Sequence, residues 1–210
     1  HETVANGLCW ACYLLAQHPP VTARLLAELE SELNGEPPTL ADLNRLPYLD
    51  GVVKESLRLY PPATTLFRTA RIPFAWQGYE FPAGATVMYT PFLSHRVAEH
   101  FPEPEAFRPE RFDPAISAVP PSYAYIPFGG GGRSCVGAPF ATLEMKTVLA
   151  MLLQRYRLDL VPNQKVVATV TTTLQPKHGL RVRPMPQDGH PERSPAPVLG
   201  NVVAAAPGPI

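Results

Sequence analysis

Hydrophobic residues recur at helical spacing in four segments of the chain, and a fifth segment predicts a single turn. The predicted helices cover residues 2–17, 21–33, 48–60 and 138–155, and the predicted turn covers residues 39–44. The first helix is nearly all apolar and ends at Pro19-Pro20, which indicates a buried helix. The second is amphipathic, with leucines on one face and acidic residues between them.

The spacing of hydrophobic residues becomes typical of strands after the third helix and again after the last one. The predicted strands cover residues 67–72, 74–79, 86–89, 157–161, 166–173 and 179–182. Turns such as Gln77-Gly78 separate them. Because helices dominate the first part of the chain and short strands follow, the predicted fold class is mainly α with small β-sheets.

Proline is unusually frequent, with 27 residues in a chain of 210, where ~5% is usual. One cluster lies in the aromatic-rich residues 101–127, which we expect to be ordered coil. A second cluster lies in residues 184–210, which contain few large apolar side chains and are expected to form a disordered Pro/Ala-rich tail. Residues 1–183 are therefore predicted to be the folded part.

The 18 basic and 18 acidic residues cancel, which argues against binding to nucleic acids because no basic field attracts the phosphates. The three cysteines are too few for a disulfide framework and favour a reducing compartment. A reducing compartment implies a cytoplasmic location. No stretch of ~20 apolar residues is available to span a membrane, but this absence carries little weight in a chain that starts within a helix. The chain starts at His1 within helical sequence, and any signal or membrane anchor is expected upstream of it.

The most specific motif is a glycine-rich segment that ends in a cysteine, Phe-Gly-Gly-Gly-Gly-Arg-Ser-Cys-Val-Gly at residues 128–137. A phosphate-binding loop would need a lysine, which the segment lacks. A dinucleotide-binding fingerprint fails because Ser134 or Cys135 stands where its third glycine should be. A flexible glycine turn beside a buried structural cysteine stays open as the plainest alternative.

A metal-binding thiolate explains more of this segment. Backbone N–H groups of the glycine turn, and the start of the helix near Ala138, would stabilise the negative charge of a Cys135 thiolate bound to iron. Glycines let a porphyrin lie almost against the main chain. Arg133 is placed to pair with a haem propionate, and Phe128 would pack under the ring.

The segment resembles the signature of the cytochrome P-450 family, Phe-x-x-Gly-x-Arg/His-x-Cys-x-Gly. Every fixed position is matched, by Phe128, Gly131, Arg133, Cys135 and Gly137. The resemblance covers residues 1–183 and implies the C-terminal, haem-binding half of this fold, incomplete in the present chain. It implies haem b (iron protoporphyrin IX) as the cofactor and Cys135 as the ligand to its iron.

Two arginine-containing motifs support the resemblance. Glu55-x-x-Arg58 alone is usually a solvated surface pair, but the family carries this motif on a buried helix, completed by an arginine like Arg111 of the Pro-Glu-Arg-Phe string. The implied role of the three residues is structural. Arg68 is implied to reach the second propionate, against the alternative of an exposed strand arginine. His95 and its neighbour Arg96 are interpreted as packing residues.

Two features of the first helix have competing interpretations. The resemblance implies that Glu2 and the Thr3 hydroxyl deliver protons for cleavage of the O–O bond, whereas Thr3 could also be a simple helix cap. Cys9-x-x-Cys12 has the spacing of a redox motif, but both cysteines lie inside an apolar helix, which favours core packing.

The implied function is a monooxygenase that inserts one oxygen atom from dioxygen into a small organic, hydrophobic substrate. Electrons would come from a partner protein, a ferredoxin or a flavoprotein reductase. Two rivals are a haem-thiolate isomerase or dehydratase, which the Glu2-Thr3 pair disfavours, and a haem or thiol sensor without enzyme activity. We expect this chain to be an inactive fragment by itself, with an exposed apolar surface along residues 4–15.

Overall fold

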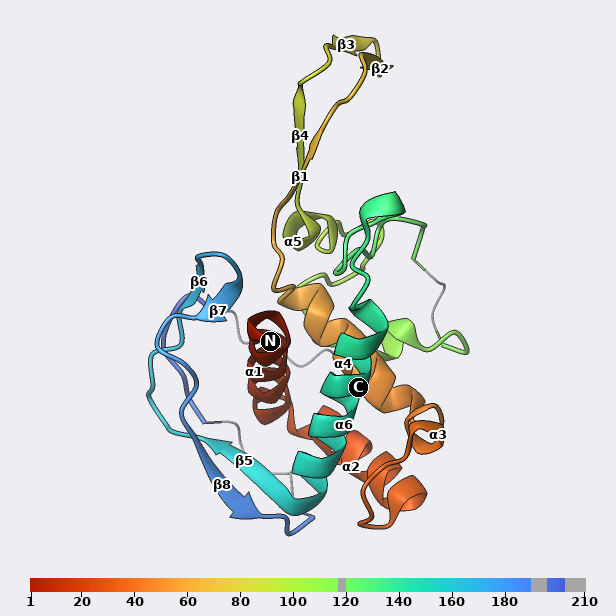
Figure 1. Cartoon of the computed structure of the whole chain (residues 1–210). Helices are drawn as coiled ribbons and strands as arrows, with labels where there is room; N and C mark the ends of the chain where they lie inside the picture. The colour runs from red at the N-terminus through yellow and green to blue at the C-terminus, as the bar shows by residue number, and fades with distance from the viewer. Residues whose placement is uncertain (117–119, 190–195, 203–210) are drawn as a thin grey trace.

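A computed structural model describes residues 1–116, 120–189 and 196–202 (Figure 1). Its α-helices are α1 (Glu2–Gln17), α2 (Pro19–Leu33), α3 (Leu40–Leu43), α4 (Pro47–Leu59), α5 (Pro91–Ser94) and α6 (Ala138–Arg155). Its strands are β1 (Leu66–Thr69), β2 (Phe74–Trp76), β3 (Tyr79–Phe81), β4 (Thr86–Tyr89), β5 (Tyr156–Leu160), β6 (Ala168–Val170), β7 (Leu174–Pro176) and β8 (Val182–Pro186). Two 3-10 turns are η1 (Pro109–Phe112) and η2 (Gly131–Arg133).

Helix α1 is the centre of the hydrophobic core. Figure 1 shows it between the β5–β8 sheet on one side and α4 and α6 on the other. Trp10 stacks on Tyr60 with ring centres 4.3 Å apart, and Tyr13 meets both rings edge-on. The Trp10 indole N–H donates to the carbonyl of Leu174 at 3.1 Å, which joins the helix to β7.

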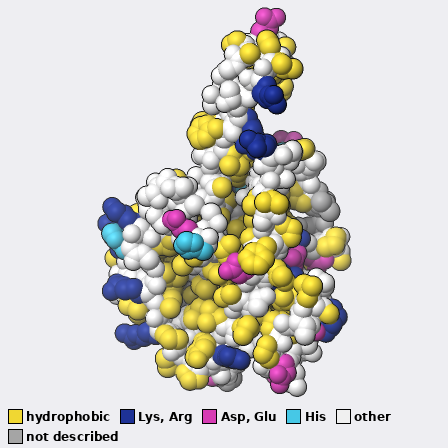
Figure 2. All heavy atoms as spheres, in the orientation of Figure 1, with side chains coloured by type: hydrophobic (Ala, Val, Ile, Leu, Met, Phe, Trp, Pro, Cys, Tyr) yellow, Lys and Arg dark blue, Asp and Glu magenta, His cyan; other side chains and the backbone are white. Residues whose placement is uncertain are grey.

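The exposed apolar surface expected along residues 4–15 is wrong for most of the helix. Trp10, Tyr13 and Leu14 are at most 1% exposed, because α4, α6 and β7 already cover three sides of α1. A stripe that includes Val4, Leu8 and Cys12 is only partly buried. Figure 2 shows hydrophobic side chains gathered in the middle of this face of the molecule, below a projecting arm.

The arm is a long antiparallel hairpin built from two small sheets (Figure 1). In the first sheet β1 pairs with β4, with Leu66 opposite Tyr89. In the second sheet β2 pairs with β3, and the turn between them has Gln77 and Gly78 at φ 48° and 82°. The turn expected at Gln77-Gly78 is confirmed, and it divides the strand expected at residues 74–79 into β2 and the start of β3.

The C-terminal segment is more ordered than its composition predicts. β8 pairs with β5 and runs to Pro186, beyond the predicted start of a tail at residue 184. Further on, the Val166 N–H donates to the Leu199 carbonyl at 2.7 Å, and the Leu199 N–H donates to the Gln164 carbonyl at 3.0 Å. The disorder expected from residue 184 is therefore wrong for 184–189 and 196–202, because neighbouring segments offer their unpaired backbone groups. Residues 190–195 and 203–210 lie outside the described residues.

In the described part of the chain, no helix is both long and apolar enough to cross a membrane.

Candidate active site

The cysteine loop is shaped by two glycines with left-handed backbone. Gly129 and Gly131 have φ values of 74° and 70°, which residues with a Cβ rarely adopt. The Gly129 N–H donates to the Ile126 carbonyl at 3.0 Å, and the Cys135 N–H donates to the Phe128 carbonyl at 2.9 Å. The loop therefore closes on itself and presents Cys135 at its end.

The sulfur of Cys135 lies just before the first turn of α6. Gly137 is the N-cap of this helix, and a Cβ built there would come within 3.8 Å of the Cys135 sulfur. The N-terminal end of a helix carries partial positive charge from its aligned peptide dipoles. Cys135 is a free, exposed cysteine, so its sulfur is available to a ligand and is not the buried structural thiol of the plainest alternative.

A cavity of about 250 Å³ lies against the loop and gathers most of the predicted site residues. Thr3, Arg68, Phe128, Arg133 and Cys135 all line it, although they come from three separate parts of the chain. Its apolar wall is completed by Val4, Leu57, Pro62, Ala63, Leu66, Ala141 and Met145. Glu2 and Gly137 do not line it.

Several of these wall residues are absent from the sequence-based site. Ala141 and Met145 lie four residues apart on α6, so their shared face follows from helical spacing once Cys135 is placed before the helix. Leu57 carries no such signal, because only the packing of α4 brings it to the cavity.

Arg68 and Arg133 place two cations at a cavity that is otherwise mainly apolar. The Arg68 guanidinium lies 5.4 Å from the centre of the Tyr89 ring and donates to its neighbouring Phe67 carbonyl at 2.8 Å. Neither arginine forms an ion pair with a carboxylate among the residues that the structure describes. Both cations are thus free for an anionic ligand group.

The chemistry of this cavity fits a haem group. A porphyrin presents apolar faces, an iron atom that takes an axial ligand, and two propionates on one edge. Apolar side chains, a sulfur and two unpaired arginines are the matching protein groups, and all line the one cavity. The residues present therefore fit the cofactor that the sequence motif implies.

Thr3 reaches the cavity from the first turn of α1. Thr3 lies inside this helix, directly after its first residue Glu2. Glu2 is its exposed neighbour in the same turn. The two residues thus place a hydroxyl at the cavity and a carboxylate in solvent, side by side in the chain.

A buried carboxylate below the loop joins two arginines. Arg58 donates to Glu55 through Nε at 2.7 Å and through Nη2 at 2.9 Å, and both side chains are fully buried. Arg111 of η1 donates to the same carboxylate at 3.1 Å. Burial lowers the pKa of Arg111, while the Glu55 charge opposes this shift. The three side chains meet as the two sequence motifs imply.

Arg58 also binds the coil that leads toward the cysteine loop. Its guanidinium donates to the carbonyls of His95, Pro104 and Ala106 at 2.8, 2.7 and 3.1 Å. The Glu55–Arg58 pair therefore holds α4 against the proline-rich coil, which agrees with a structural role.

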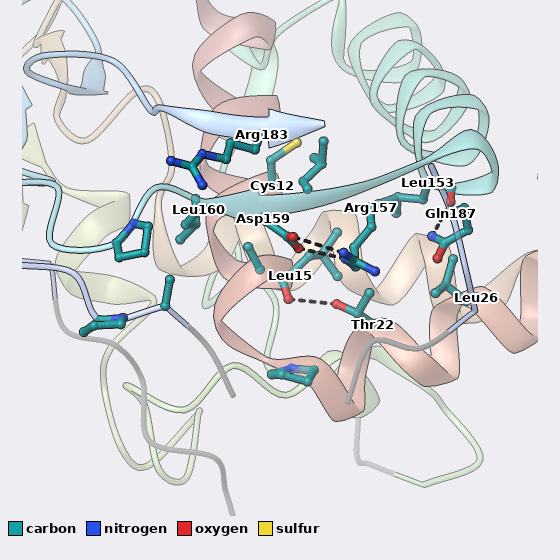
Figure 3. A pocket seen from close by; sticks show the side chains of 16 residues that line it. Cys12, Leu15, Thr22, Leu26, Leu153, Arg157, Asp159, Leu160, Arg183 and Gln187 are labelled. Atoms are coloured by element: carbon teal, nitrogen blue, oxygen red, sulfur yellow. Dashed lines mark hydrogen bonds and ion pairs between the residues drawn. The ribbon is translucent and has the colours of Figure 1, made fainter. Parts of the chain in front are cut away.

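A second cavity, of about 450 Å³, lies near the C-terminal end of α1 (Figure 3). Two of its charged groups are paired with each other, because Arg157 forms an ion pair with Asp159 as well as with Asp188, and Arg183 is a further cation at its wall. Burial raises the pKa of Cys12, at its edge, to about 12. A protonated, half-buried thiol agrees with core packing and does not favour a redox role for the Cys9-x-x-Cys12 motif.

Comparisons with known proteins give one consistent result. Residues 1–183 match the cytochrome P-450 family. The chain is 40% identical over 184 residues to cytochrome P-450 120 of Synechocystis sp., covering 87% of this chain and 41% of that protein. It is 39% identical over 167 residues to cytochrome P-450 4V2 of Mus musculus, covering 79% of this chain and 31% of that protein.

A solved structure supports the same fold. The chain superimposes on a cyanobacterial CYP120A1 bound to retinoic acid with a TM-score of 0.82 and 38% identity, covering 89% of this chain and 43% of that one. The chain thus spans less than half the length of each of these three relatives.

Proposed function

Because the chain belongs to the cytochrome P-450 family, we propose that it supplies the proximal part of the haem site of a haem-thiolate monooxygenase. This oxidoreductase would insert one oxygen atom from dioxygen into an organic substrate. The observation that carries the proposal is the cavity at which the Cys135 sulfur, two unpaired arginines and the Thr3 hydroxyl meet. Since the chain spans 41% of the length of one relative, the activity is proposed for the full-length protein.

Haem b, when bound, supplies the iron that activates dioxygen, and this chain's residues would hold it. The Cys135 sulfur would bind the iron, and the start of α6 would stabilise its negative charge. Arg68 and Arg133 would bind the propionates. Phe128 and the apolar wall exclude water, while Gly137 keeps the space beside the sulfur free.

Thr3 and Glu2 are proposed to manage the proton supply. The Thr3 hydroxyl can donate a proton into the cavity and be reprotonated from the solvent side. Glu2 is exposed, so it exchanges protons with solvent. This arrangement favours the monooxygenase over an isomerase or dehydratase, which needs no proton delivery to dioxygen.

The substrate is proposed to be a hydrophobic molecule. The cavity walls near Thr3 are apolar, with Val4, Ala63 and Leu66 beside it. The CYP120A1 structure is described as bound to retinoic acid, an apolar polyene with one carboxylate. A retinoid is therefore the first substrate class to test.

Electrons are proposed to come from a partner protein, a ferredoxin or a flavoprotein reductase. A reducing, cytoplasmic location is proposed with it, because an exposed ligand thiol such as Cys135 must stay reduced.

The test is product formation by the full-length protein with a reductase, NADPH, a retinoid and isotopically labelled dioxygen. The proposal predicts a hydroxylated product that carries one labelled oxygen atom and needs NADPH. An isomerised or dehydrated product without label would establish the rival enzyme class, and haem binding without any product under reducing conditions would favour a sensor.

A further inference from the structure

His95 is a fully buried imidazole that bridges two separate main-chain segments. It follows α5 directly and is 0% exposed. Its Nδ1 lies 3.2 Å from the Arg58 carbonyl oxygen at the end of α4. Its Nε2 accepts a hydrogen bond from the Ile126 N–H at 2.9 Å. Ile126 lies two residues before Phe128, at the start of the cysteine loop.

These two partners determine the protonation state of the ring. A carbonyl oxygen only accepts, so Nδ1 must carry a hydrogen and donate it to Arg58. A main-chain N–H only donates, so Nε2 must be bare. The imidazole is therefore neutral and a single tautomer. Burial, helped by the charges of Arg58 and Arg96, lowers the pKa of His95 to about 4, which agrees with this state.

The bond to Ile126 is the first of three hydrogen bonds that lead to Cys135. The Ile126 carbonyl accepts from the Gly129 N–H at 3.0 Å. The Phe128 carbonyl then accepts from the Cys135 N–H at 2.9 Å. A shift of Ile126 would therefore move Cys135 as well, because hydrogen bonds within the short loop connect the two residues.

Few other hydrogen bonds hold the start of the cysteine loop in place. Within the described ranges, only two hydrogen bonds tie residues 120–134 to elements that precede them in the chain. One is the His95–Ile126 bond. The other joins the Tyr125 hydroxyl to the Lys54 carbonyl at 3.0 Å, and the Tyr125 ring lies against the imidazole with centres 5.2 Å apart. Both are on the side of the segment that faces α4.

We propose that His95 is a positioning residue for Cys135: its neutral imidazole fixes the start of the cysteine loop on α4 and so sets where the sulfur lies in the cavity. The inference rests on the proposed function, because it takes Cys135 to be the iron ligand. His95 acts only through Ile126 and touches neither substrate nor cofactor.

Three variants of the full-length protein separate this role from simple packing. His95→Leu removes both hydrogen bonds. His95→Gln keeps an acceptor near the Nε2 position, whereas the shorter amide of His95→Asn reaches only the Nδ1 position. The Gln and Asn variants are both polar and differ in which hydrogen bond they can keep, to Ile126 in His95→Gln and to Arg58 in His95→Asn. The same changes at His178, which is exposed and lies far along the chain, are the matched controls.

Two measurements are made on each variant. Hydrogen exchange of the Ile126 amide should become about tenfold faster in His95→Leu and His95→Asn, the factor expected when one buried hydrogen bond is lost. The thiolate-type, red-shifted Soret band of the ferrous–carbonyl complex should lose intensity in these two variants at equal haem content. His95→Gln and all His178 variants should stay close to wild type in both measurements.

The outcomes that overturn the two proposals differ. Wild-type Ile126 exchange together with a full red-shifted band in both His95→Leu and His95→Asn would overturn the positioning role and leave the function standing. Equal losses in His95→Gln and His95→Asn would also overturn it, because packing alone would then explain them. A wild-type protein that binds haem without the red-shifted band would overturn the proposed function itself.

Discussion

The Arg58 guanidinium holds the Glu55 carboxylate through two hydrogen bonds, of 2.7 and 2.9 Å, inside the protein where neither side chain touches water. The carboxylate also accepts from the Arg111 side chain at 3.1 Å and from the Arg108 N–H at 2.9 Å. Buried charges are tolerated only when they have such partners. The Glu55 carboxylate is therefore the shared acceptor that holds α4 to η1.

Glu55→Ala should lower the free energy of unfolding by roughly 3–5 kcal/mol, because it leaves two cations, one of them fully buried, without their counter-ion. The measurement is chemical denaturation. Glu32→Ala is the control, since Glu32 pairs with Arg45 at the surface and should cost at most ~1 kcal/mol. Equal losses in the two variants would show that the cluster has no special role.

Sequence patterns predicted the local features of this protein better than those that depend on distant contacts. The bounds of α1 and α6 follow from apolar runs ended by prolines or started after the cysteine motif. The meeting of Glu55, Arg58 and Arg111 follows from two motifs that the family resemblance connects.

The burial of α1 and the backbone pairing of the C-terminal residues were harder to predict. The coverage of α1 depends on α4, α6 and β7, which come from three other regions of the chain. The order of residues 196–202 depends on backbone partners near Gln164 and Val166, and composition carries no information about such pairing. The two hydrogen bonds made by His95 could not be predicted either, because the sequence does not distinguish a histidine that only packs from one that bridges two main-chain segments.

Gly131→Ala should destabilise the apoprotein by ~1–2 kcal/mol, because its φ of 70° is strained for any residue with a Cβ, although no atom lies within 4 Å of the added methyl group. Gly132→Ala is the matched control. Gly132 also has open space but no positive φ, so the same change should stabilise the protein by ~0.4–1 kcal/mol. Thermal denaturation of both variants measures these stability changes. Equal changes in the two variants would contradict the left-handed backbone at Gly131.

Stability should fall as the pH drops from about 6.5 to about 4, in part because of His95. In this window the unfolded imidazole binds a proton that the folded one does not, so acid favours the unfolded state by up to about 3 kcal/mol. Unfolding free energies of wild type and His95→Gln, measured across this range, isolate the contribution. The wild type should show the steeper loss, and parallel curves would argue against a neutral, buried His95.

Thr3→Ala should lower the ratio of product formed to NADPH consumed by at least about tenfold, because a positioned proton donor typically contributes ~10²–10⁴-fold. Thr3→Ser keeps the hydroxyl and should retain most of this ratio. Product and NADPH are measured in the same reaction. An unchanged ratio in Thr3→Ala would remove Thr3 from the proton supply.

The Cys135 sulfur is proposed to be the ligand of the haem iron. The most direct test is the absorption spectrum of the ferrous–carbonyl complex of full-length Cys135→Ser, with Cys9→Ser as the control for loss of a thiol elsewhere. Only a thiolate opposite carbon monoxide gives the red-shifted Soret band. The account predicts that Cys135→Ser loses this band and Cys9→Ser keeps it, whereas a red-shifted band that persists in Cys135→Ser would contradict it.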